Sequence, residues 1–134
     1  MKRYAAFLRG MNIGGRRITN ADLCACFETI GFTEVSAFLA SGNVVFQSRQ
    51  AAKATQQRIS NGLAKQLGYD VPTFLRSAAE VRAVAGSNPF LERPTANARG
   101  KLQVAFLHRP ASSEALTEVA AHSSEDDWLA IEGR

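Results

Sequence analysis

The sequence predicts an α+β fold in which two helices cover one face of a four-stranded sheet, followed by a linker and the start of a second unit of the same kind. Three observations lead to this fold class. Apolar runs of strand length alternate with two longer segments of helical period. A glycine follows each helical segment, and a strand-helix-strand pattern begins again after residue 101.

The composition is that of an ordinary globular domain. The chain has 134 residues, of which 46% are hydrophobic and 21% are charged, so it has enough apolar side chains to build a core. No apolar run approaches the roughly 20 residues that cross a membrane, and no charged-then-apolar leader precedes the first strand pattern. We therefore expect a cytoplasmic protein that makes no membrane contact.

A strand and a helix are predicted near the N-terminus. Tyr4–Leu8 is a short apolar run whose length indicates a strand. After a glycine-rich loop, Thr19 and Asp22 stand at the spacing of a capping box, with aspartate in place of the usual glutamate or glutamine. Apolar residues then recur with helical period up to Gly31, namely Leu23, Cys26, Phe27 and Ile30.

A hairpin, a second helix and a fourth strand are predicted next. The β-rich runs 35–40 and 44–48 are separated by Ser41-Gly42-Asn43, small residues that tolerate the positive φ of tight turns. Residues 51–67 carry apolar side chains four positions apart, which predicts a helix. Residues 71–75 form another extended run, and their proline suits an edge strand or the first residues of a strand.

The order β-α-β-β-α-β is that of a ferredoxin-like plait, which we assign to residues 1–76. Residues 77–101 are expected to form a short helix and a linker. A second capping box, formed by Ser77 and Glu80, begins this helix, and proline, asparagine and glycine mark the linker.

Residues 102–134 are predicted to form an incomplete second half. The expected elements are a strand over 102–107, a helix that Ser112 or Ser113 caps, and a strand over 128–131. A plait that stops at this point leaves an unpaired strand edge, which native proteins usually cover. We therefore expect more chain or a partner, such as a second copy of the protein, to complete this half.

The net charge of +4 is unevenly distributed. Before residue 113 there are 15 basic and 6 acidic side chains, a net of +9, whereas the remainder has Arg134 against six acids, a net of −5. A basic body attracts phosphate-rich partners such as nucleic acid through a field that salt weakens. Basic side chains also serve simply to keep a small protein soluble, so charge alone does not decide between these roles.

No metal, cofactor or catalytic constellation is predicted. Cys24 and Cys26 point in different directions on a helix, and no further cysteine joins them in a tetrahedral metal site. We expect Cys26 in the core and Cys24 on the helix face. Neither His108 nor His122 stands at a spacing that ties it to a nucleophile, and the acidic run 125–127 is interpreted as solvated.

One end of the plait is the candidate site. Strand directions place the loops at residues 9–18, 41–43 and 68–70 at the same end of the sheet. The first loop leads into a helix N-terminus, which favours anions. Arginines supply guanidinium forks for phosphate or carboxylate, and glycines permit a close backbone approach. The candidate ligand-binding residues are Arg9, Asn12, Gly14, Gly15, Arg16, Arg17, Ser41 and Asn43.

A structural interpretation of the same residues stays open. The glycines can satisfy turn geometry, Asn12 and Asn43 can cap their own loops, and the arginines can be solvated. The spacing from Gly10 to Gly15 matches neither a dinucleotide-binding fingerprint nor a Walker motif. No nucleotide cofactor is therefore predicted.

Three segments resemble a known family. They are the opening Arg3–Arg16 with its LRGMNIGG run, the helix Leu23–Phe32, and the hairpin Leu39–Phe46 with its SGNVVF run. In this order they resemble the bacterial family known only as domain of unknown function 1697. The resemblance implies two ferredoxin-like halves in one protein, with members generally continuing past residue 134. It implies no activity and no catalytic residue.

Three functions are compatible with these observations. The first is a non-enzymatic binding module for a phosphate-bearing ligand or nucleic acid, which uses the Arg9–Arg17 loop. The second is an enzyme that acts on a small anionic substrate at the same loops, with Tyr69 or Asp70 as a candidate acid or base. The third is an assembly protein that offers the strand edges of its second half to another chain.

Overall fold

The computed structural model describes residues 1–39, 42–90, 102–124 and 129–134. Its helices and strands, in chain order, are β1 (Lys2–Leu8), α1 (Asn20–Ile30), β2 (Thr33–Phe38), β3 (Asn43–Ser48), α2 (Ala52–Leu67), β4 (Thr73–Ser77), α3 (Ala78–Ala85) and α4 (Ser113–Ala121). Contacts between residues divide the chain into two compact units, Met1–Ala85 and Gly86–Arg134, and each unit is described by itself.

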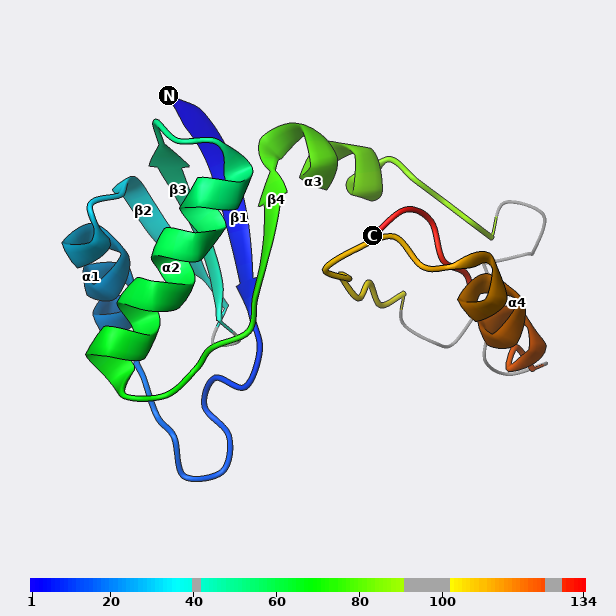
Figure 1. The fold of residues 1–134 in the computed structure, drawn as a ribbon, viewed down its shortest axis with the longest axis horizontal. Coiled ribbons are helices and arrows are strands. Elements are labelled where there is room, and N and C mark those ends of the chain that lie inside the picture. The colour runs from blue at the N-terminus through cyan, green and yellow to red at the C-terminus, as the bar shows by residue number, and fades with distance from the viewer. Residues whose placement is uncertain (40–41, 91–101, 125–128) are drawn as a thin grey trace. The chain divides into compact units, whose positions relative to one another are not determined.

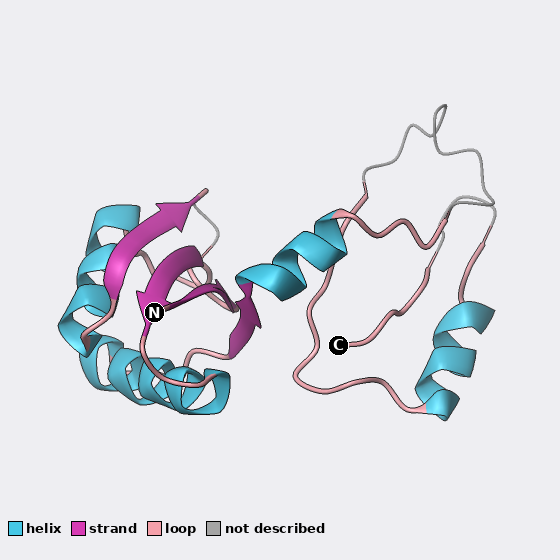
Figure 2. Cartoon of the chain, turned by 90° about the horizontal axis from the view of Figure 1, so that it is seen from above, coloured by secondary structure: helices cyan, strands magenta, loops and turns pink. Residues whose placement is uncertain are grey.

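The first unit contains a four-stranded antiparallel sheet in the order β2-β3-β1-β4. Helix α1 contacts β2, α2 contacts β4, and the two helices contact each other. Both helices lie on the same face of the sheet (Figure 1; Figure 2). The predicted α+β class and the element order β-α-β-β-α-β are confirmed.

Local signals begin and end the helices as predicted. The Thr19 hydroxyl accepts from Asp22 N at 3.1 Å and donates to the Asp22 carboxylate at 2.9 Å, which closes the capping box of α1. Gly31 ends that helix with φ 100° and Gly68 ends α2 with φ 80°, a backbone conformation that glycine adopts at little cost. Helix boundaries are readable in the sequence because these bonds span only a few residues.

Two strand positions differ from the prediction by two residues. Strand β2 covers Thr33–Phe38 and so begins two residues before the predicted start at Val35, and Ala40, the last residue of the prediction, lies outside the described residues. An irregularity in the pairing of β2 with β3 lies between Thr33 and Ser36. Strand β4 covers Thr73–Ser77 and not 71–75. Pro72 therefore lies just before β4, where its missing N–H interrupts no ladder bond.

The core lies between the sheet and the two helices. Four aromatic rings meet there: Phe46 lies 4.6 Å from Phe32, 5.3 Å from Phe27 and 6.0 Å from Tyr4, measured between ring centroids. The side chains of Ile59 and Leu63 on α2 are fully buried against them. Cys26 packs against this core but stays partly exposed, as does Cys24.

The capping box at the start of α3 is also confirmed. Ser77 N donates to the Glu80 carboxylate at 2.8 Å, and Glu80 N donates to the Ser77 hydroxyl at 3.2 Å. In the second unit Ser112 caps α4, since its hydroxyl accepts from Ala115 N at 3.1 Å. Among the described residues, no helix is long and apolar enough to span a membrane.

The strands predicted in the second unit are not observed. Residues 102–107 and 129–131 have no strand structure, and Trp128, the first residue of the second predicted strand, lies outside the described residues. Leu102 and Val104 are 70% and 55% exposed. An apolar run forms a stable strand only when neighbouring strands supply hydrogen bonds and a packing surface, and no described residue pairs with 102–107 as a strand.

Candidate functional site

Three loops meet at one end of the sheet, as the strand directions predicted (Figure 1). Leu8 N donates to Gly42 O at 2.9 Å, which joins the end of β1 to the β2–β3 hairpin. Arg9 N donates to Pro72 O at 3.0 Å, which joins the same point to the loop before β4. We call the described residues 8–19, 42–43 and 68–72 the loop rim.

Gly42 packs the hairpin tightly against the first loop. A Cβ atom at this position would lie 2.8 Å from Met11 Cγ and 3.0 Å from Leu8 O. The φ of Gly42 is 80°, so both the space and the backbone conformation require glycine. Its neighbour Ser41, a candidate ligand residue, lies outside the described residues.

Two candidate ligand residues hold the first loop in shape. The Asn12 side-chain oxygen accepts from Ile18 N at 2.7 Å. The Arg17 guanidinium donates to Asn12 O and to Arg16 O, both at 2.9 Å. These bonds favour the structural interpretation for Asn12 and Arg17, because the polar groups named here already have partners within the loop.

Arg16 and Arg9 present their charge differently. The guanidinium carbon of Arg16 lies 3.9 Å from the centre of the Tyr69 ring, so a cation–π contact orients an exposed side chain. The Arg9 side chain is exposed and has no hydrogen bond to a described residue. Both charges are therefore accessible from solvent.

The glycine pair beside Arg16 is open to its surroundings. Gly14 and Gly15 have φ values of 57° and 84°, and a Cβ atom at either position would meet nothing within 4 Å. Their conformation explains why glycine is suited to both positions. The N-terminus of α1 is less available, because Asp22 already places a carboxylate in its first turn.

Asn43 lies where the hairpin enters β3. It is half-buried and stands opposite Phe7 on β1 and Phe38 on β2. This register places Asn43 within the sheet and next to Gly42, at the edge of the loop rim. The structure thus brings Arg9, Arg16, Gly14, Gly15 and Asn43 to the same end of the sheet.

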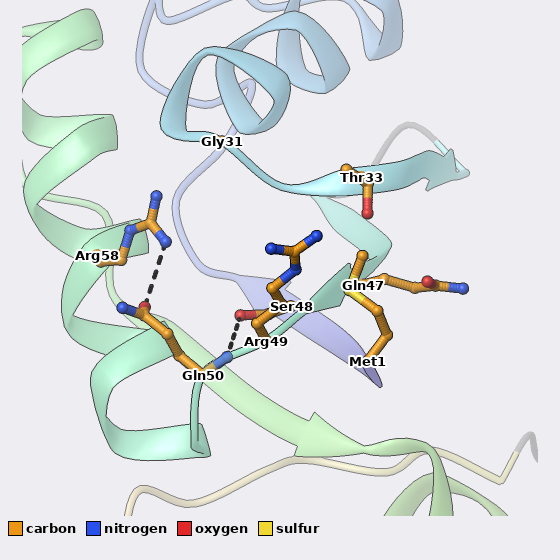
Figure 3. A pocket seen from close by; sticks show the side chains of 8 residues that line it. All are labelled: Met1, Gly31, Thr33, Gln47, Ser48, Arg49, Gln50 and Arg58. Atoms are coloured by element: carbon orange, nitrogen blue, oxygen red, sulfur yellow. Dashed lines mark hydrogen bonds between the residues drawn. The ribbon is translucent and has the colours of Figure 1, made fainter.

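A pocket that was not predicted from the sequence lies at the opposite end of the sheet (Figure 3). Its lining residues are Met1, Gly31, Thr33, Gln47, Ser48, Arg49, Gln50 and Arg58. We call this set the far end. Ser48, a buried polar residue at an inward strand position, is a faint sequence signal, because buried hydroxyls need partners.

Hydrogen bonds hold three side chains of the far end, Ser48, Gln50 and Arg58. Arg58 donates to Ile30 O at the end of α1 and to the Gln50 side-chain oxygen at 3.3 Å, and its guanidinium carbon lies 5.2 Å from the Phe32 ring centre. The Ser48 hydroxyl accepts from Gln50 N at 3.1 Å. Tyr4 donates to Gln50 O at 3.1 Å.

Two described side chains, Tyr4 and Cys26, have shifted pKa values. Burial, and secondarily the charge of Glu80, raises the pKa of Tyr4. Burial, and secondarily Asp22, raises the pKa of the Cys26 thiol. Within the described parts of the chain, no three His, Cys, Asp or Glu side chains gather closely enough to hold a metal ion. The acidic run 125–127 lies outside those parts.

Comparisons with known proteins bear on the fold and the family. No curated protein matches the sequence. A solved structure of the conserved bacterial protein SP0830 from Streptococcus pneumoniae is similar, with a TM-score of 0.60 and 25% sequence identity. The similarity covers 66% of this chain and 49% of that one, so it extends over about half of the length of that protein.

The sequence profile of the proteins of unknown function called DUF1697 matches residues 1–134. Because that match spans the whole chain, this chain belongs to the DUF1697 family.

Proposed function

We propose that this chain is a non-enzymatic binding module that captures a phosphate-bearing ligand at its loop rim. The observation that carries the proposal is the exposed Arg16 guanidinium, which lies 3.9 Å from the Tyr69 ring centre. A guanidinium stacked on a ring keeps its N–H groups at the ring's edge, where they can form paired bonds to a phosphate. Holding it there before binding lowers the entropy cost of capture.

The surroundings of Arg16 suit a phosphate group. Gly14 and Gly15 have no side chains and open space around them, so a ligand can reach their backbone. Arg9 adds a second exposed charge at the same rim, and Asn12 and Arg17 act as positioning residues by shaping the loop. The unit 1–85 has eleven basic and five acidic side chains, a net charge of +6, which attracts anions over a longer range.

The alternative of an enzyme at the same loops has weaker support. Tyr69, one candidate acid or base, has its ring beneath the Arg16 guanidinium. Asp70, the other candidate, is exposed on the surface. We therefore assign the loop rim a role in binding.

The test of this function is a titration with tripolyphosphate at low salt. The expected results are binding, shifts in the amide signals of Gly14 and Gly15 in nuclear magnetic resonance spectra, and an affinity that falls as salt increases. Replacing Arg9 and Arg16 together by alanine should weaken binding by at least about tenfold, since each charged hydrogen-bonding group contributes about 1.5–3 kcal/mol.

The matched control is a double variant with the same loss of charge elsewhere. Arg49→Ala combined with Lys53→Ala removes two exposed cations from the region where β3 joins α2. Binding should weaken by less than about threefold in this control, since only the long-range field changes. Equal weakening in both double variants, or no binding by the wild-type protein, would overturn the proposed function.

We also propose that residues 1–76 are a ferredoxin-like plait and that residues 102–134 belong to an incomplete second one. The element order and the sheet order β2-β3-β1-β4 support the first assignment. Exposed apolar side chains in the second unit support the second, including Leu102, Val104 and Leu116. Another copy of the chain could cover them, and light scattering that finds only a folded monomer would exclude this assembly.

A further inference from the structure

We propose that the phosphate-bearing ligand is single-stranded nucleic acid, whose bases stack on the open face of the sheet next to the loop rim. This inference rests on the proposed function and names its ligand class. The open face is the face opposite α1 and α2 (Figure 2). Side chains alternate between the two faces of a strand, so Tyr4, Ala6 and Leu8, which are buried in the core, place Phe7 on the open face.

The strand register puts three aromatic rings in one row across this face. Phe7 stands opposite Phe74 on β4 and opposite Asn43 on β3, and Asn43 stands opposite Phe38 on β2. The row Phe38, Asn43, Phe7 and Phe74 thus crosses all four strands. We call these four residues the aromatic row. Strands lie about 4.8 Å apart, so the row is about 14 Å long.

Exposure is greatest at the β2 end of the aromatic row. Phe38 is 64% exposed, whereas Phe46 on the other face of the sheet is fully buried. Val45, in the next row of the open face, is 37% exposed. Phe7 and Phe74 are half-buried, and Arg76 on β4 is buried, with its guanidinium bonded to Leu75 O. Contact with the ligand is therefore assigned mainly to β2, β3 and β1.

The position of the row beside the loop rim favours nucleic acid over a purely anionic ligand. Phe7 lies two residues before Arg9, and Asn43 adjoins Gly42 of the rim. Nucleic acid combines flat bases, which stack on aromatic side chains, with phosphates, which pair with arginine. A ligand that contacts both features needs both kinds of group.

The nucleic acid must be single-stranded. In a duplex the faces of the bases are covered by their neighbours, whereas unpaired bases can be splayed onto an aromatic surface. Four-stranded sheets that carry aromatic residues on an open face stack two or three bases in known RNA-binding modules, and Phe38 on β2 and Phe7 on β1 offer rings for two bases. Arg3, exposed on the same face and opposite Gln47, supplies a further cation for the backbone.

The test measures binding of a short fluorescent oligouridylate, its duplex form and tripolyphosphate at one salt concentration. Phe38→Ala should weaken binding of the oligouridylate by at least about fivefold, the effect of losing one stacked base, and leave tripolyphosphate binding unchanged. Phe38→Trp should restore binding, because the larger ring also stacks. Leu129→Ala is the matched control, since it truncates an exposed apolar side chain outside the first unit, and it should change neither affinity.

The outcomes separate this inference from the proposed function. If Phe38→Ala binds the oligouridylate normally, or if the duplex binds as tightly as the single strand, stacking on the sheet is overturned while phosphate capture at the rim stands. If neither probe binds, both proposals fail. If the protein is a dimer that Phe38→Ala dissociates, the aromatic row is an interface between copies and the inference is overturned.

Discussion

The two ends of the sheet both carry arginine, but they use it differently. At the far end Arg58 is half-buried and bonded to Ile30 O and Gln50, and it lies over the Phe32 ring. At the loop rim Arg16 is exposed and is oriented by the Tyr69 ring. An arginine whose N–H groups are bonded within the protein stabilises the fold, whereas one that is oriented and exposed is available to a ligand.

The difference shows why charge counts are a poor guide to function. Arg9, Arg16 and Arg17 were all candidate ligand residues because they lie in one loop that leads into α1, yet Arg17 donates to two carbonyl groups of its own loop. Arg58 was not singled out, and its contacts tie α1 to α2 and to the segment after β3. The following predictions test this contrast, beginning with the largest expected effect.

Gly42→Ala should lower the free energy of unfolding by about 3 kcal/mol. The added methyl group would overlap Met11 and Leu8 O, and φ near 80° costs a non-glycine residue about 1–2 kcal/mol. Gly68→Ala is the control, because its φ is also 80° but a Cβ atom there meets nothing within 4 Å. Gly68→Ala should lower the free energy of unfolding by about 1 kcal/mol. Equal losses in urea denaturation would mean that the hairpin does not pack against the first loop.

Arg58→Met should lower the free energy of unfolding by about 2 kcal/mol. It removes the bonds from the guanidinium to Ile30 O and Gln50 but keeps most of the aliphatic stem. The corresponding change at the other end, Arg16→Met, should stay within about 0.5 kcal/mol, as surface substitutions usually do. Thermal unfolding of both variants measures the two losses of stability. A larger loss for Arg16→Met would reverse the roles of the two ends.

Tyr69→Leu should weaken tripolyphosphate binding by about three- to fivefold. It removes the ring that orients Arg16, a contact of about 0.5–1 kcal/mol at an exposed site, and retains an apolar side chain against the core. Tyr69→Phe keeps the ring and should bind like the wild-type protein. Calorimetric titration distinguishes these cases. If Tyr69→Leu bound normally, orientation of Arg16 by the ring would have no part in capture.

The smallest expected effect is a loss of stability at alkaline pH that originates next to the far end. Burial, and secondarily Glu80, raises the pKa of Tyr4 above its usual 10.0. The unfolded chain then loses the phenol proton at a lower pH than the folded protein does. The stabilisation is therefore complete below about pH 10 and is lost as the pH rises towards the folded-state pKa.

Urea denaturation between pH 8 and pH 11 measures this dependence. Tyr4→Phe should make it shallower, because the titrating phenol is gone. The Cys26 thiol, whose pKa is raised mainly by burial, acts in the same direction, so both proteins should also carry Cys26→Ala. An unchanged slope in Tyr4→Phe would assign the alkaline loss to other groups.

The sequence alone determined the features that depend on neighbouring residues. The capping boxes of Thr19 with Asp22 and of Ser77 with Glu80 form within a single helical turn, and the glycines after α1 and α2 end them locally. The order of the elements then fixed the strand directions, and with them the meeting of three loops at the rim. The prediction of a strand over residues 102–107 was wrong because a strand needs hydrogen-bonding partners, and a local sequence pattern cannot supply them.

Only the tertiary structure decided what the candidate side chains contact. Arg16 contacts the ring of Tyr69, which is distant in the sequence. Asn12 and Arg17 form hydrogen bonds within their own loop. Phe38 lies in one row with Phe7 and Phe74 only because of the register of the four strands. Register depends on how whole strands bury one face, and a shift of one residue would send every side chain to the other side. For this reason the sequence predicted which end of the sheet carries the loop rim, but it did not predict which side chains are accessible to a ligand there.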